Sequence, residues 1–273
     1  MSISKLKTLS IAMLLLVNSF FLGIIIVDNY TLARDERKAI ENVCSILQSN
    51  GIKIDSGNIT KTKPIRTMRT ARAVEIEANI AKAFLGSTEM TYQGVIYLYE
   101  NAQRGTAEFY SAGDFEIRLH KGVITGENGM QRTVQDLLRN MRLEAMEFTL
   151  VIEPESGKVR ALSAYNGISV FNCAIDFIFK ENSLQTVRGR YLTGIEAIEN
   201  GAQISHVTTA LLEFLAAVKR GDVECTEITR VQAGYQHNVV GSFGEGVISP
   251  VWLVTTVNAR YTIDSATREI RML

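Results

Sequence analysis

Residues 205–220, SHVTTALLEFLAAVKR, carry a stripe of apolar side chains at helical spacing. The stripe follows the pattern i, i+4, i+7, i+8 and i+11, and it consists of Val207, Leu211, Phe214, Leu215 and Val218. Side chains with this spacing lie on one face of an α-helix, and that face has to pack against another element. The stretch therefore predicts an amphipathic helix that covers part of a larger core.

Residues 130–141 repeat this spacing at Met130, Val134, Leu137, Leu138 and Met141. Strand-like segments separated by turn residues follow both helices. They are 148–153, 158–165, 173–179 and 184–192 after the first helix, and 224–235, 251–257, 261–264 and 269–272 after the second. The chain is therefore predicted to be α+β, with repeated units of a helix packed on an antiparallel β-sheet.

Two short stretches, Ile152–Arg160 and Ile263–Arg271, support the repeat. In each, a strand ends at an acidic residue, a tight turn follows, and a second strand begins. Acidic hairpin turns are common, so the match is also compatible with coincidence.

The first half of the chain shows a similar mixture of elements. Helices are predicted at 32–49 and 75–85, strands at 92–99, 106–110 and 115–119, and an irregular or edge-strand passage at 56–72. In the last of these strands, Phe115, Ile117 and Leu119 alternate with Glu116 and Arg118. This alternation is typical of a sheet with one solvated face.

The segment from Thr8 to Val27 contains no Lys, Arg, Asp, Glu or His. A helix of about 20 residues spans the hydrocarbon layer of a bilayer. A cleaved signal peptide is the alternative, but its apolar region is about 7 to 15 residues long and ends at a cleavage site of small residues. Only Thr31-Leu32-Ala33 resembles such a site. A retained transmembrane helix is therefore favoured.

Lys5 and Lys7 precede this span and favour a cytoplasmic N-terminus, while Arg34, Arg37 and Lys38 on the other side weaken that preference. The predicted location is the cell membrane, with one span and an extracytoplasmic C-terminal part. The predicted division is a cytoplasmic tail (1–7), the transmembrane helix (8–27), a membrane-proximal α+β domain with a helical stalk (28–125) and a C-terminal α+β domain (126–273) of two related units, about 126–200 and 201–273.

The composition excludes some functions. Basic and acidic side chains are equally numerous, 29 of each, so nucleic acid is not an expected partner. Cys44, Cys173 and Cys225 lie far apart in sequence and are odd in number, which favours buried thiols over disulfides or a metal site.

No familiar catalytic motif occurs in the chain: there is no H-E-x-x-H, G-x-S-x-G, Walker-type or EF-hand pattern. His120, His206 and His237 are isolated in sequence, and structural roles are favoured for all three. We therefore expect no catalytic residues, no cofactor and no metal site.

A glycine-rich stretch contains Gly241, Phe243, Gly244 and Gly246. It lacks the strand-to-helix context of a phosphate-binding loop, because Pro250 and a strand follow it. It is interpreted as a mobile loop between strands that is available to a partner.

Small and polar side chains in the expected span indicate a face for contact with another helix. Ser19 and Gly23 are four residues apart, Ala12 lies nearly on the same line, and Asn18 is adjacent. Such residues allow close approach of helices in lipid, but they are also ordinary in membrane helices.

Three features resemble the YycH/YycI family. They are the single span with a helical start at Ala33–Ile40, the run Pro250–Val254, and the ending Tyr261–Ile270, which also resembles PepSY-type domains. Thr267-Arg268 stands where a glycine is usual in that ending. The resemblance implies a membrane-anchored extracytoplasmic regulator of the sensor histidine kinase WalK (YycG) in Gram-positive bacteria, with that kinase and a sister YycH/YycI-type protein as partners. It supplies no catalytic residues.

Two further functions remain open. One is a membrane-tethered PepSY-like module that binds a cell-wall component or a secreted protease. The other is a tethered hydrolase, which predicts a cleft with clustered carboxylates or histidines.

Overall fold

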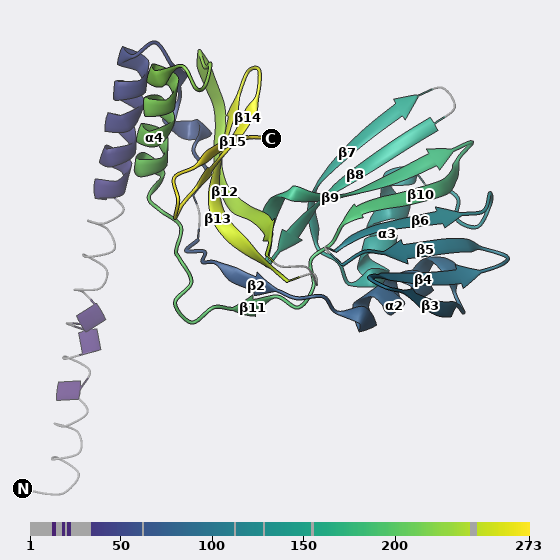
Figure 1. The fold of residues 1–273 in the computed structure, drawn as a ribbon. Coiled ribbons are helices and arrows are strands. Elements are labelled where there is room, and N and C mark those ends of the chain that lie inside the picture. The colour runs from purple at the N-terminus through teal and green to yellow at the C-terminus, as the bar shows by residue number, and fades with distance from the viewer. Residues whose placement is uncertain are drawn as a thin grey trace, which may run out of the picture.

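The computed structural model describes residues 13–14, 18–19, 21–22, 34–61, 63–111, 113–127, 129–153, 156–240 and 245–273. Over these residues the protein is α+β, as predicted (Figure 1). Its helices are residues 34–49, α2 (Val74–Leu85), α3 (Met130–Met141) and α4 (Val207–Arg220). The strands form a large, mostly antiparallel sheet in two parts, each with its own helices.

Eight strands make up the first part, in the order β7-β8-β9-β10-β6-β5-β4-β3, and all neighbours are antiparallel. They are β3 (Glu89–Gln93), β4 (Ile96–Asn101), β5 (Gly105–Phe109), β6 (Asp114–Leu119), β7 (Ala145–Glu153), β8 (Ser156–Tyr165), β9 (Ile168–Lys180) and β10 (Ser183–Arg190). Strands β3 and β7 are therefore the two edges of this part.

The eight strands fall into two similar halves. One half is α2 followed by β3 to β6, and the other is α3 followed by β7 to β10. The last strands of the two halves, β6 and β10, pair in antiparallel orientation at the centre of the sheet. The element order and this pairing are those of a duplicated unit with an approximate two-fold axis between β6 and β10.

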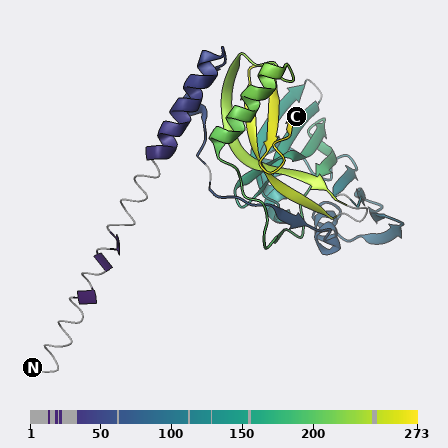
Figure 2. The same cartoon turned by 60° about the vertical axis from the view of Figure 1, so that its left-hand side comes forward.

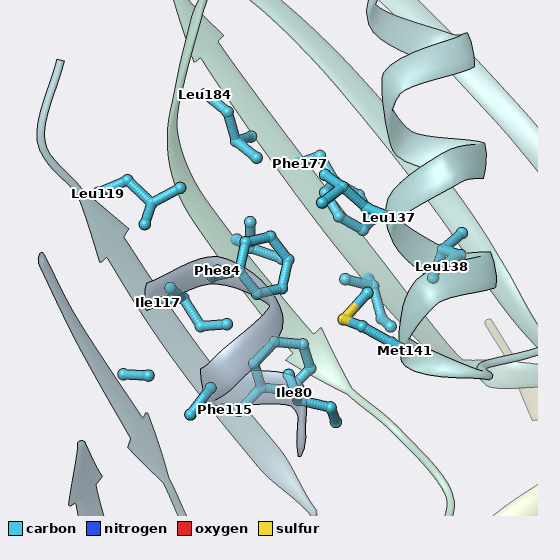
Figure 3. Packing of buried hydrophobic residues seen from close by; sticks show 14 of the residues in the cluster. Ile80, Phe84, Phe115, Ile117, Leu119, Leu137, Leu138, Met141, Phe177 and Leu184 are labelled. Atoms are coloured by element: carbon cyan, nitrogen blue, oxygen red, sulfur yellow. The ribbon is translucent and has the colours of Figure 1, made fainter. Parts of the chain in front are cut away.

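Helices α2 and α3 cover the same face of this sheet and form the first core with it. Figure 3 shows Phe84 of α2 and Leu137 of α3 directed into the core that Phe177 of β9 also lines, and Ile80 of α2 belongs to the same buried cluster. Phe84 and Phe177 are fully buried. Burying one side chain of this size contributes about 1.5–3 kcal/mol, so the core depends on both helices.

Arg72 ties the segment before α2 to this core. Its guanidinium forms a bidentate ion pair with the fully buried carboxylate of Glu77, with Nε–Oε1 and Nη2–Oε2 distances of 2.6 and 3.0 Å. The same group donates to the carbonyl oxygen of Phe109 and lies 4.6 Å from the centroid of the Tyr97 ring. The buried charge of Glu77 is thus neutralised and hydrogen-bonded, which a charged group away from water requires.

The second part of the sheet combines two long strands with five short ones and carries the second core. Its strands are β1 (Lys53–Ile54), β2 (Met68–Thr70), β11 (Glu196–Ala197), β12 (Glu227–Val239), β13 (Gly246–Thr256), β14 (Arg260–Asp264) and β15 (Ile270–Met272). The helix of residues 34–49 lies alongside α4 in both views (Figure 2). Its buried Val43, Cys44 and Leu47 belong to the same core as Leu211 and Phe214 of α4.

The two parts meet where β12 and β9 pair in parallel orientation at Tyr235 and Val170. A small cluster of buried residues that includes Cys173 and Ile248 lies around this junction. The boundary expected at residue 125 passes through the first core instead, because β6 pairs with β10 and α2 packs beside α3.

The prediction of one strand over 92–99 is wrong. The chain forms a hairpin there, β3 and β4, with Gly94 at a φ of 67° in the turn. The passage at 56–72 contains a 3₁₀ turn, η1 (Ser56–Asn58), and β2, which pairs with both β11 and β13. Polar residues are uncommon in strands that pair on both sides, which is why β2 was not predicted as such a strand from the sequence.

Of the expected transmembrane span, residues 13–14, 18–19 and 21–22 are described; they are helical, and their side chains are exposed. Among all described residues, no helix combines the length and apolar character needed to cross a bilayer. The remainder of the expected span lies outside the described residues.

Candidate binding site

The face of the eight-stranded sheet opposite α2 and α3 is charged. On β6, Phe115, Ile117 and Leu119 point into the first core, so the alternating residues Glu116 and Arg118 lie on the other face. This confirms the solvated face predicted from the alternation of residues 115–119, because successive side chains of a strand point to opposite sides.

Charged residues of opposite sign lie next to one another across four strands of this face. Arg188 of β10 is in register with Glu116 of β6 on one side and with Asp176 of β9 on the other. Asp176 is in turn in register with Arg160 of β8. Cross-strand neighbours of opposite charge attract one another, so the register creates a row of alternating charges through the middle of the sheet.

An ion pair between β10 and β6 lies beside this row of charges. Arg190 of β10 forms a bidentate pair with Asp114 of β6, with Nε–Oδ1 and Nη2–Oδ2 distances of 2.9 and 2.7 Å. Hydrogen bonding to Asp114 raises the pKa of Arg190. The pair joins the two halves of the duplicated unit at their central strands.

Asp176 is the most crowded carboxylate of the row. Its Oδ2 lies 2.8 Å from Nζ of Lys158, while its Oδ1 is 3.9 Å from Nε of Arg160. Oδ1 is buried and has no hydrogen-bond partner among the described residues. Two cations thus share one carboxylate, and one of its oxygens is unsatisfied.

A depression of about 490 Å³ lies over these residues, and we call it the charged hollow. Its charged lining residues are Asp114, Glu116, Arg160, Asp176, Arg188 and Arg190. Small-molecule pockets are mainly apolar, whereas surfaces that recognise proteins or charged chains present complementary charges. The charged hollow therefore fits a ligand that carries both positive and negative groups.

Asn172, which also lines the charged hollow, connects it to the second part of the protein. Its amide Nδ2 donates to the carbonyl oxygen of His237 at 2.7 Å, and the backbone N–H of His237 donates to its Oδ1 at 2.8 Å. The ring Nε2 of His237 lies 3.1 Å from Oγ1 of Thr70, and Nδ1 has no partner among the described residues. Burial lowers the pKa of His237 to about 4.

The three cysteines are free, and Cys44 and Cys173 are buried as predicted, while Cys225 is half-buried. Burial raises the pKa of Cys173 to about 12. Within the described part of the chain, no group of three histidine, cysteine or acidic side chains is placed to hold a metal ion.

Of the contact residues singled out in the sequence, only Asn18, Ser19 and Gly246 are described, and none of these three lines the charged hollow. Ala12, Gly23, Gly241, Phe243 and Gly244 lie outside the described residues. Asn18 and Ser19 are helical and exposed.

Gly246 is buried at the start of β13. A Cβ atom there would come within 2.5 Å of Nε2 of His237 and 2.8 Å of Oγ1 of Thr70, which explains the glycine. This position therefore serves packing against β12 and β2.

The charged hollow was not among the sites predicted from the sequence. Its acidic and basic residues look scattered along the chain because they come from β6, β8, β9 and β10. One signal was present: both β6 and β10 place charged residues at every second position, Asp114, Glu116 and Arg118 in one and Arg188 and Arg190 in the other.

The fold and the site thus define an α+β protein with a charged, open sheet face. No known protein family matches its sequence, and no curated protein matches it. Among solved structures, it is similar to an uncharacterized protein from Eubacterium rectale ATCC 33656, with a TM-score of 0.48 and 10% identity over 77% of this chain and 82% of the other. It is also similar to the Bacillus megaterium YpeB C-terminal domain, with a TM-score of 0.37 and 10% identity over 75% of this chain and 99% of the other.

Proposed function

We propose that this protein is a membrane-tethered binding module of the PepSY-like kind that acts outside the cytoplasm by contact. Its target is a secreted protease or a cell-wall component, held against the charged hollow. The single observation that carries this proposal is the row of alternating charges on the open face of the sheet, at the centre of the duplicated unit.

Two properties of the charged hollow support contact with a large partner. It spans side chains of four strands, and in the described part of the chain the helices that pack on this sheet, α2 and α3, lie on the opposite face. Arg188, at the centre of the β6–β10 pairing, is exposed. Charges arranged in this way contribute mainly to the specificity and rate of association.

The proposal is tested with the full chain in detergent micelles or nanodiscs. Binding is measured to purified cell walls and, separately, to secreted proteases, whose inhibition is also recorded. Arg188→Glu is expected to weaken binding about tenfold, which corresponds to about 1.4 kcal/mol. Arg132→Glu makes the same charge change at an exposed position of α3, on the other side of the sheet, and is expected to leave binding unchanged.

Retention of both targets by Arg188→Glu would show that the charged hollow is not the contact site. Failure of the wild-type chain to bind either target would reject the proposed function. Salt dependence gives a further check, because binding through exposed charges weakens as ionic strength rises.

A second candidate is regulation of a WalK (YycG) type sensor histidine kinase, together with a sister YycH/YycI-type protein. The observation in its favour is the helix of residues 34–49, which follows the expected span and packs Val43, Cys44 and Leu47 into the second core. This helix is the first described element after the expected span in sequence, so it is the candidate route from the membrane to the second core.

This candidate is tested by co-purification of the kinase from membranes, comparing the wild type with Ser19→Leu plus Gly23→Leu. Loss of the kinase only in the double variant supports a contact face in the membrane. Equal recovery rejects that face, and no recovery from the wild type counts against kinase regulation.

A further inference from the structure

Strand β7 is an edge strand with an apolar centre. Within the described part of the chain it pairs with β8 and with no second strand. Its residues 148–152, FTLVI, include no charged side chain. Leu150, Val151 and Ile152 are 41%, 48% and 70% exposed. The backbone groups on the outer side of such a strand are available to another strand.

Exposed edges of this kind are usually protected by charged side chains, proline or a bulge at the centre of the strand. The pairing of β7 with β8 has one irregularity of the bulge type, between Ala145 and Glu147 at the start of β7, and the central residues of the strand pair regularly. Uncharged runs with high β-propensity on an open edge are sites of strand addition, either by a specific partner or by aggregation. β7 therefore has the properties of a docking strand.

The opposite edge, β3, differs although it occupies the equivalent place in the duplicated unit. It carries Glu89, and its Tyr92 ring lies 4.9 Å from the ring of Tyr97 on β4. One of its large side chains is thus engaged within its own hairpin. Met90 on β3 is 54% exposed and provides a matched position for a control.

The two faces of β7 specify different neighbours for an added strand. Leu150 pairs with Val159, which points into the first core, so Leu150 and Ile152 lie on the helix side of the sheet and favour apolar side chains there. On the other side, Val151 is in register with Lys158. Lys158 and Arg160 share the single carboxylate of Asp176, and Glu147 of β7, on the same side, lies 4.0 Å from Arg230 of β12. Three positive groups thus face two carboxylates in these contacts.

We propose that β7 binds an extended polypeptide segment of a partner protein by strand addition, and that this segment alternates apolar with acidic side chains. The apolar side chains lie beside Leu150 and Ile152 on the helix side. The acidic side chains lie on the open face, toward Lys158 and Arg160. The docking strand adjoins the charged hollow, because Arg160 lines both, but the added strand pairs with the outer backbone edge of β7, which does not line the charged hollow.

The test uses the full chain in nanodiscs and a fluorescent peptide of nine residues, the length of β7, that alternates valine with glutamate. Binding is followed by fluorescence anisotropy. We expect Ile152→Lys and, separately, Leu150→Lys to weaken binding about tenfold, because each places a charge among the apolar contacts. Met90→Lys on β3 is expected to change binding less than about twofold. A peptide that alternates valine with lysine is expected to bind about tenfold more weakly than the glutamate peptide.

Four results would overturn the proposal. They are no binding by the wild type up to about 1 mM peptide, equal loss in Met90→Lys and Ile152→Lys, equal binding of the lysine peptide, and self-association of the wild type that Ile152→Lys abolishes. The last result would mean that a second copy of the chain occupies β7. Thermal unfolding of Ile152→Lys serves as the folding control, and this highly exposed position is expected to tolerate lysine.

Discussion

His237 makes the stability of the protein dependent on pH. Its side chain is 6% exposed, Nε2 contacts Thr70, and Nδ1 has no hydrogen-bond partner among the described residues. Burial, with a smaller effect of Arg190 in the same direction and of Asp114 in the opposite one, lowers its pKa from 6.5 to about 4. The native state therefore holds a neutral imidazole.

The direction of the effect follows from the pKa values of the two states. Below about pH 6.5 the unfolded chain binds a proton at His237 that the native chain does not bind until about pH 4. The contribution to stability is thus complete above about pH 6.5 and is lost as the pH falls toward 4. From pH 7 to pH 4.5 the expected loss is about 2 kcal/mol, with a limit of about 3 kcal/mol at lower pH.

The perturbation is His237→Gln, which removes the titrating group and keeps a polar side chain near Thr70. The assay is urea unfolding at pH 7.0, 5.5 and 4.5, followed by the fluorescence of Trp252, the single tryptophan of the chain, which is buried in the second core. Between pH 7 and pH 4.5 the wild type is expected to lose about 2 kcal/mol more than the variant. An equal loss in both proteins would refute this reasoning.

Three further predictions concern other buried or strained groups. Glu77→Gln breaks a buried ion pair with Arg72 and is expected to lower the free energy of unfolding by about 3–5 kcal/mol. As a control, Glu269→Gln in an exposed pair is expected to change it by less than about 1 kcal/mol, and urea unfolding measures both variants. Arg142, which ends α3 at a φ of 57°, is predicted to stabilise the protein by about 1 kcal/mol when replaced by glycine, seen as a higher melting temperature. In the native chain Cys173 is expected to resist alkylation at pH 8 and Cys225 to react faster, with both reacting fully in urea, as mass spectrometry would show.

Helices were the elements best predicted from sequence. The helix predicted over 130–141 coincides with α3, and the helices predicted over 75–85 and 205–220 lie within two residues of α2 and α4. This success has a physical reason: each stripe is a local pattern, and each helix buries it against a sheet. The strand over 92–99 failed because its aromatic residues conceal the turn at Gly94.

The charged hollow could not be predicted because it depends on register. Glu116 and Arg188 are far apart in sequence, and they become neighbours only when β6 pairs with β10. Sequence patterns locate strands, but they do not specify which strand pairs with which, or at which residue. Gly246 was interpreted from the sequence as part of a mobile loop, but in the structure it is a buried strand residue with no room for a side chain.

The duplicated unit also sets an order of events in folding. Within each half, every strand pairs with its neighbour in sequence, so these contacts close short loops. Among the described strands, the β6–β10 pairing is the one that joins the two halves, and the chain between these strands contains α3 and β7 to β9. Because short loops close at lower entropic cost, we expect each four-stranded meander to form early and the β6–β10 seam to form late. The charged hollow, which straddles that seam, would then be among the last surfaces to be completed as the chain folds.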